Sequence, residues 1–517
     1  MPTPTPTHQP GANPRGRLIG GVGWFSAAYF VPVTAALVWL GFRNAHVPRA
    51  AIAYSFVLLA ITQALILSAS AAPSLGAQET TAQKLGFLKR VLFVNLISCL
   101  VARYNTYEFH FPRDFFHISY PFGNYSDFLA TVGYVSDANG KHFLLTTGYL
   151  PFSVVVADAF SVLIRGLTAV FKPGPTVPVG TLVAIGVYAL ALALLVALAG
   201  RFIRTNPAMR GSRSIILLFF ASSYPFFMQF ERGNFSIFAL IALAIFFLLD
   251  EESRLRPIVV MLLVSLKVTY VIFAPLYLLC RAKFNWWVSA LLFGLIQVAS
   301  VLVVVYHGPR LPFANGDYSE LAKNIIGSGY FNWPTALITF STSGLESLRL
   351  SFLHIFSGVQ HEQAFASPTI KLIGRYVVPA VIAAYGWRMF RNRVPLSVDV
   401  CILFFFLVLL FHPMFGDYNL PLLSPFLLYY LARDQKPHAV LLFSLLALCF
   451  LIATDIPFMG IDCCGGQYVP DRYVYVTAKP AVICGIALTA IAVLFLRLRR
   501  AGAEGEQPPR QGLVDPI

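Results

Sequence analysis

The chain has 517 residues, of which 57% are hydrophobic and only 12% are charged. Soluble globular proteins carry about a quarter charged residues, so this composition excludes an ordinary soluble enzyme and indicates a polytopic membrane protein. The formal net charge of +15 does not indicate nucleic-acid binding, because the basic residues form short clusters between apolar runs, where they orient membrane helices. The seven cysteines lack the paired spacing of metal ligands, so the sequence indicates neither a metal site nor a cofactor.

Apolar runs recur along the chain at about the 20 residues needed to cross a bilayer. In lipid such runs must be helices, because every backbone group has to be paired within its own segment. The runs lie at 24–42, 51–72, 86–103, 149–171, 178–200, 213–230, 233–249, 256–279, 284–306, 368–387, 395–411, 418–431, 438–457 and 480–496. We therefore expect an all-α polytopic membrane protein with about 11–13 transmembrane helices, and with interfacial helices in its outer loops.

The runs and the polar stretches between them divide the chain into six parts. They are a disordered cytoplasmic leader at 1–17, two N-terminal transmembrane helices at 18–85, a membrane module at 86–306 with an outer loop at 104–148, a second outer loop at 307–367, C-terminal transmembrane helices at 368–500 and a disordered cytoplasmic tail at 501–517.

The positive-inside rule orients the two ends of the chain but leaves the middle open. If residues 149–171 span the membrane, simple alternation places the arginines after 178–200 outside, against the rule. These are Arg201, Arg204, Arg210 and Arg213. If 149–171 instead lies at the interface, the arginines return to the inside, and another segment must then cross twice or not at all.

The outer loop at 104–148 is the polar centre of this sequence and carries several carboxylates. Asp127 leads an apolar and aromatic segment. A carboxylate beside a low-dielectric surface can have its pKa raised toward neutrality and serve as a general base. The alternative is that Asp127, like Asp114 and Asp137 in the same loop, is an ordinary loop carboxylate.

Lys267 lies in the middle of the apolar run at 256–279, where an ionisable side chain costs about 2.5–3.5 kcal/mol on insertion. One interpretation is a structural lysine that snorkels or pairs with another helix. The other, which we favour, is a cation that holds an anionic substrate group. Arg232 precedes Gly233, which permits a turn, and Asn234, which can cap the next helix. Arg232 is thus either part of a turn with an ion pair to Glu231 or a site residue.

His412 follows the apolar run at 395–411, close to Asp417 and Tyr418. It is either a histidine at a helix end or a residue that binds phosphate or shuttles a proton.

The order of these motifs along the chain resembles that in the GT-C glycosyltransferases. It specifically resembles the glycosyltransferase family 87 group of polyprenyl-phosphate-sugar-dependent mannosyltransferases. The resemblance covers residues 86–431. The matching positions are Asp127–Phe128, Gly140, Tyr149 with Pro151, Gly233–Asn234, Lys267 with Pro275, and His412. The chain differs from the family pattern in two additional spans before the first outer loop, and in a late histidine that lacks the usual paired-histidine context.

The resemblance implies a GT-C-type bundle whose catalytic module begins at residue 86, and a bacterial plasma-membrane protein with its active site on the extracytoplasmic face. It implies a polyprenyl-phosphate sugar as donor, a hydroxyl of a lipid or glycan as acceptor, and no nucleotide-sugar site. The implied base is Asp127, with Asp114 as the second match. The donor phosphate would be bound by Lys267, Arg232 and His412, and the substrate cavity would be lined by Tyr149, Asn234, Asp417 and Tyr418.

Two other functions suit a protein with many spans and a buried lysine. A transporter or flippase of lipid-linked sugars would not need two long outer loops, and it would often show an internal repeat, of which this sequence has none. A ligase or polymerase of lipid-linked glycans would use a pyrophosphate-linked donor, so donor specificity separates it from a glycosyltransferase.

Overall fold

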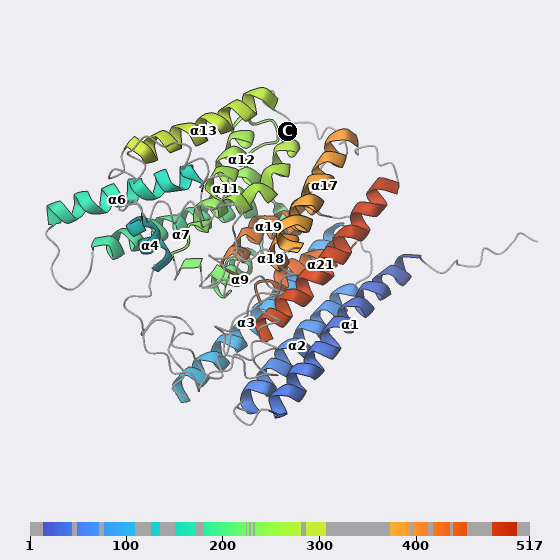
Figure 1. Ribbon diagram of the computed structural model, residues 1–517. Coiled ribbons are helices and arrows are strands. Elements are labelled where there is room, and N and C mark those ends of the chain that lie inside the picture. Colours follow the sequence, from blue (N-terminus) through green and yellow to red (C-terminus); the bar gives the residue numbers. More distant parts are fainter. Residues whose placement is uncertain are drawn as a thin grey trace, which may run out of the picture.

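The computed structural model is a bundle of helices (Figure 1). It describes residues 14–43, 49–71, 77–108, 126–134, 150–171, 179–223, 225–226, 229–230, 233–280, 286–306, 373–392, 398–411, 417–434, 438–451 and 478–503. Every regular element within these ranges is a helix. The predicted fold class, an all-α polytopic membrane protein, is confirmed.

Helices from the two ends of the chain lie side by side in one part of the bundle (Figure 1). They are α1 (Pro14–Arg43), α2 (Arg49–Ser70), α3 (Ala77–Glu108) and α21 (Ala478–Ala503). The Tyr29 hydroxyl donates a hydrogen bond to the Ala481 carbonyl at 2.9 Å, and a Cβ on Gly485 would lie 2.4 Å from Cζ of Phe30. Glycine is therefore required where α1 crosses α21.

The first and last helices begin and end inside segments that were predicted to be disordered. α1 begins at Pro14, and α21 continues to Ala503. Residues 14–17 and 501–503 are therefore helical. The rest of the predicted leader and tail lies outside the described residues.

Three helices form the centre of the bundle: α18 (Val398–Phe411), α19 (Ser424–Arg433) and α20 (Ala439–Leu448). Their side chains are buried on nearly all sides. A helix that is hydrophobic all round is surrounded by other elements rather than lying at a surface, and α18 and α20 have such sequences.

The remaining helices cover this centre. They are α4 (Ser126–Tyr134), α6 (Pro151–Phe171), α7 (Val179–Thr205), α8 (Pro207–Arg210), α9 (Arg213–Ala221), α11 (Ser236–Leu248), α12 (Leu255–Leu266), η2 (Val268–Leu279), α13 (Trp286–Tyr306), η7 (Ile373–Val377), α17 (Val378–Asn392) and η8 (Asp417–Leu423). α11 packs against α7 and α12, and α13 packs against α6 (Figure 1).

The apolar run at 256–279 does not form the single helix that its hydropathy predicts. It divides into α12 and the 3-10 helix η2, with Lys267 in an extended conformation between them (φ −151°, ψ 142°). The two helices pack along each other, and Arg256 at the start of α12 is close enough to Cys280 after η2 to interact electrostatically. The segment is therefore a helical hairpin with Lys267 at its turn.

The bundle has two ends, and different segments of the chain meet at each of them. One end, here called the Asn234 end, contains the turn before α11, the Lys267 turn and the start of η8. α11 and α19 run from it to the opposite end, here called the Arg497 end, which contains the start of α3, the start of α18 and Asp434. Residues far apart in the sequence meet at each end.

Three helices of the described ranges are long and apolar enough to cross a bilayer: Pro151–Val170, Val179–Thr205 and Ala481–Leu498. The other apolar helices found there have 10–17 residues, including Ser236–Leu248 and Val398–Phe411. The predicted number of spans therefore stays a prediction.

Candidate functional site

The Lys267 turn interrupts the helix ladder between α12 and η2. Such irregular backbone is tolerated at membrane depth only where protein surrounds it or where it lines a cavity. Here the carbonyl of Leu266 accepts hydrogen bonds from the Leu150 N–H, at 3.4 Å, and from the Ser153 hydroxyl. Lys267 itself is 7% exposed. The start of α6, directly after the predicted site residue Tyr149, is thereby attached to the hairpin turn.

The turn before α11 is held by a buried polar network, as the sequence predicted for Gly233 and Asn234. Gly233 has φ 65°, a left-handed conformation that glycine adopts without strain. Asn234 Oδ1 accepts a hydrogen bond from the Ser236 N–H at 2.9 Å, which satisfies one of the unpaired N–H groups at the start of the helix. The Asn234 side chain thus pairs the first N–H of α11 from the position before the N-cap residue, Phe235.

Gln229 completes this turn, although it belongs to none of the motifs predicted from the sequence. Its amide donates to the Asn234 carbonyl at 2.9 Å, and its Oε1 accepts from the Ser236 hydroxyl at 2.7 Å. A glutamine in the apolar run at 213–230 was the available signal, because a buried amide needs partners.

Asp127 is the second residue of α4. The next residue, Phe128, is completely buried. Its ring lies 5.3 Å from that of Phe160, 5.8 Å from that of Tyr188, and 5.8 Å from that of Phe235, on which it stacks. Phe235 follows Asn234 directly, so the Asp127–Phe128 motif is anchored beside the Gly233–Asn234 turn. The Asp127 side chain lies outside the described part of the chain.

Asp417 and Tyr418 open η8, whose next residue, Asn419, is fully buried. The Tyr270 hydroxyl donates to Asn419 Oδ1 at 3.4 Å, and η8 also packs against α11. Tyr270 lies three residues after Lys267, so η8 is joined to the same hairpin. The side chains of Asp417 and Tyr418 are outside the described part of the chain.

The structure thus brings four of the predicted segments to the Asn234 end: the start of α4, the start of α6, the turn before α11 and the start of η8. The Lys267 turn lies among them. Asp114, Tyr149, Arg232 and His412 fall outside the described residues, and their roles stay predictions. Within the described ranges, no group of three or more His, Cys, Asp or Glu side chains is arranged to hold a metal ion.

A large apolar cavity of about 600 Å³ lies between α7, α9, α11 and α19. Along α11 it is lined by Leu240, Ala244, Phe247 and Leu248, so on this helix it begins nearly two turns after Asn234 and follows the helix toward the Arg497 end. Ser424 and Pro425, directly after η8, line it from α19. A space with this lining accommodates a hydrocarbon chain rather than a sugar.

Residues 161–413 match the model of glycosyltransferase family 87. No curated protein and no solved structure matches the chain. The protein is a helical membrane bundle that contains this match, and it is therefore a membrane glycosyltransferase. The similarity to glycosyltransferase family 87 is shown for residues 161–413 of the 517-residue chain.

The matched range contains four of the predicted site residues and begins after the first outer loop. Within it are Arg232, Asn234, Lys267 and His412. Asp127, Asp114 and Tyr149 precede it, and Asp417 and Tyr418 follow it.

Proposed function

We propose that the protein transfers a hexose, mannose, from a polyprenyl-phosphate donor to a hydroxyl of a lipid or glycan acceptor on the extracytoplasmic face of the membrane. The observation that carries this proposal is the convergence at the Asn234 end. There the helix whose second residue is Asp127 is anchored beside Asn234, and the Lys267 turn is attached to α6 and η8. A carboxylate and an ammonium group on neighbouring elements supply a base and a phosphate-binding cation.

The proposed reaction is a single displacement with inversion. The acceptor oxygen attacks the anomeric carbon while the bond from this carbon to the phosphate oxygen breaks, and the phosphate leaves with the electron pair. Asp127 takes the proton of the attacking hydroxyl, with Asp114 as the other candidate. The products are the glycosylated acceptor and polyprenyl phosphate.

The negative charge that grows on the departing phosphate requires cationic or donor groups already in position. We assign this role to Lys267, Arg232 and His412. Lys267 is held at a helix break, a position that several membrane proteins use for ionic ligands. Tyr149, Asn234, Asp417 and Tyr418 would line the sugar-binding part of the cavity.

The apolar cavity beside α11 supports a lipid-linked donor. It begins near the Asn234 turn and is bounded by α19, which follows η8 directly. A donor whose phosphate lies at Lys267 could extend its hydrocarbon chain into this space without exposing it to water.

The orientation of the bundle is supported by its basic residues. With the Asn234 end outside, the α7–α9 connection with its arginines and the Arg497 end are cytoplasmic, as the positive-inside rule favours. The α12–η2 hairpin starts at the cytoplasmic end, turns at Lys267 and returns to the same end, so in this orientation it is the segment that crosses the membrane twice.

The contacts of α6 bear on its path. Phe152 borders a small cavity together with Leu266, and Phe160 stacks on Phe238. These contacts favour an interfacial path for α6, although its length and hydropathy would also permit a span.

This orientation predicts that a cysteine placed at Asp137, in the first outer loop, reacts with a membrane-impermeant maleimide on intact cells. A cysteine placed at Glu504, after α21, should react only after permeabilisation. The unmodified chain reports labelling of its own cysteines, and this background is subtracted. Protection of the Asp137→Cys variant in intact cells, with labelling of Glu504→Cys, would reverse the proposed orientation.

The donor is tested with membranes that contain the protein, incubated separately with polyprenyl-phosphate mannose and polyprenyl-phosphate arabinose. We expect the mannose donor to be consumed, with release of polyprenyl phosphate, and the arabinose donor to remain. Membranes from cells without the protein provide the background. Consumption of the arabinose donor alone would replace the sugar in this proposal, and consumption of neither would contradict a polyprenyl-phosphate donor.

A further inference from the structure

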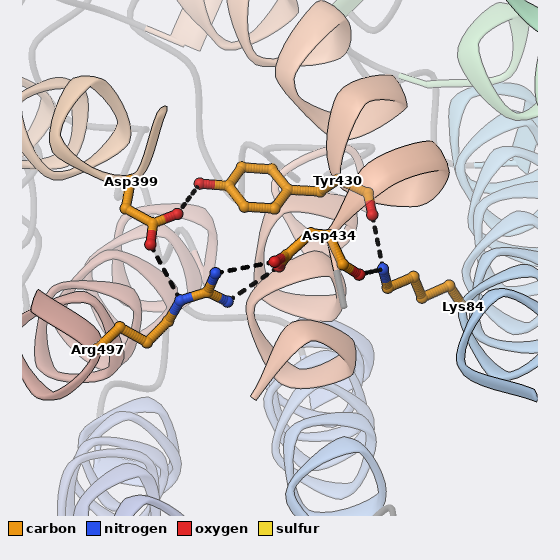
Figure 2. A network of polar contacts seen from close by, with 5 residues as sticks. All are labelled: Lys84, Asp399, Tyr430, Asp434 and Arg497. Carbon is orange, nitrogen blue, oxygen red and sulfur yellow. Dashed lines mark hydrogen bonds and ion pairs between the residues drawn. The ribbon is translucent and has the colours of Figure 1, made fainter. Parts of the chain in front are cut away.

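At the Arg497 end, five buried residues from four helices form a closed polar network, here called the clamp (Figure 2). Arg497 of α21 is 7% exposed. Its Nη1 and Nη2 donate to the two carboxylate oxygens of Asp434 at 3.0 Å each, and its Nε donates to Asp399 Oδ2 at 3.1 Å. The guanidinium thereby joins α21 to the start of α18 and to the residue after α19.

Tyr430 and Lys84 complete the clamp. The Tyr430 hydroxyl donates to the other carboxylate oxygen of Asp399. Lys84 of α3, which is 1% exposed, donates to the main-chain carbonyls of Tyr430, at 2.6 Å, and of Asp434. These carbonyls end α19, where a helix leaves acceptors unpaired and favours positive charge. Lys84 therefore caps α19 from a neighbouring helix.

The clamp balances two cations against two carboxylates, yet it is a poor source of stability. A buried ion pair is often no more stabilising than apolar side chains of the same volume, because removing the charges from water costs several kcal/mol per ion. What a fully paired network does provide is one arrangement of its helices, since any other arrangement leaves a buried charge unpaired. The clamp therefore fixes the position of the C-terminal end of α19 relative to α3, α18 and α21.

α19 connects the clamp to the proposed site. It follows η8 without a break, so residues 417–433 are continuously helical from Asp417 to Arg433. Midway, Phe426 stacks on Phe273 of the hairpin with ring centroids 5.9 Å apart. At the far end, Asn419 is bonded to Tyr270. A displacement of the clamped end would therefore move η8 relative to the Lys267 turn.

We propose that Arg497 and Lys84 are positioning residues for substrate binding, which act through α19 to hold η8 against the hairpin. This inference rests on the proposed function, because it assigns η8 to the substrate cavity. Lys84, Asp434 and Arg497 lie outside the range that matches the family model, and Asp399 lies inside it. The clamp thus ties the matched module to helices that precede and follow it.

The test uses the double variant Arg497→Met with Asp399→Asn. It removes the guanidinium and one carboxylate together, so the net charge of the clamp does not change. The full-length protein is compared with wild type in two measurements, steady-state transfer from polyprenyl-phosphate mannose and hydrogen exchange of the peptides that cover residues 417–433. We expect KM for the donor to rise about tenfold with kcat little changed, the pattern of lost ground-state binding. We also expect the amides of η8 to exchange about tenfold faster.

Two further variants make the result specific. Arg497→Lys keeps the charge but loses the bidentate geometry, so it should restore part of the donor affinity. Arg433→Met removes an exposed cation next to Asp434 and should leave KM and exchange unchanged. If the double variant does not accumulate in membranes, Lys84→Met, which removes only the cap on α19, is measured in the same way.

Wild-type KM and wild-type exchange in the double variant, or in Lys84→Met where that replaces it, would overturn the inference. So would an equal loss in Arg433→Met. If the wild-type protein transfers no sugar from a polyprenyl phosphate, the proposed function fails, and hydrogen exchange at η8 decides the role of the clamp independently.

Discussion

Replacing Asp127 by Asn is expected to lower the rate of sugar transfer by about 10²–10⁴-fold, the usual contribution of a positioned general base. Asparagine keeps the shape of the side chain but cannot accept the proton of the attacking hydroxyl. The neighbouring Phe128 continues to anchor α4 through its contacts with Phe160, Tyr188 and Phe235. The variant should therefore insert and fold as wild type does. The measurement is product formation per amount of folded protein in membranes.

Asp114→Asn is the matched control, because Asp114 is a carboxylate of the same outer loop that is also followed by phenylalanine. It should transfer sugar at nearly the wild-type rate. The reverse result, with transfer lost in Asp114→Asn and kept in Asp127→Asn, would move the base to Asp114. Normal transfer in both variants would leave the proposed mechanism without its base.

Replacing Lys267 by Met is expected to lower kcat on the order of 10²-fold, comparable to removing one group that stabilises charge in a transition state. Methionine retains the apolar part of the side chain but not the ammonium group that we place against the departing phosphate. The backbone of the turn should persist, because its bonds to Leu150 and Ser153 use the main-chain carbonyl of Leu266. Steady-state kinetics with the mannose donor separate kcat from KM.

Lys84→Met provides a control in which a different buried lysine is removed at the opposite end of the bundle. It should change KM and leave kcat close to wild type, whereas Lys267→Met should change kcat. A wild-type kcat in Lys267→Met would show that the lysine serves only the fold of the hairpin, and the phosphate would then have to be bound by Arg232 and His412.

Two kinds of result support the candidate site. Residues 161–413 match the family model and include Asn234 and Lys267. Asp127 lies before that range, so its place in the site depends on the packing of Phe128 against Phe235. The position of α4 is therefore a property of the three-dimensional structure, and the match to the family does not determine it.

The hairpin is where hydropathy and structure disagree most. The run at 256–279 has 24 residues, enough to cross a bilayer once, and hydropathy carries no information about where such a segment turns back. In the structure, Phe273 of η2 packs against Phe405 and Phe426 of the central helices. These partners come from residues more than 100 positions later in the chain, which a reading of local pattern cannot detect.

The sequence by itself determined the class of the protein, the positions of most helices, the turn and cap at Gly233–Asn234, and the family resemblance. All of these depend on local properties: hydropathy summed over about 20 residues, the backbone freedom of glycine and the order of short motifs. The tertiary structure alone decided which of these motifs meet, because that depends on long-range packing. It also paired Lys84, Asp399, Asp434 and Arg497 in the clamp. In the sequence they are isolated charges near the ends of apolar runs, and only the fold brings them within hydrogen-bond distance.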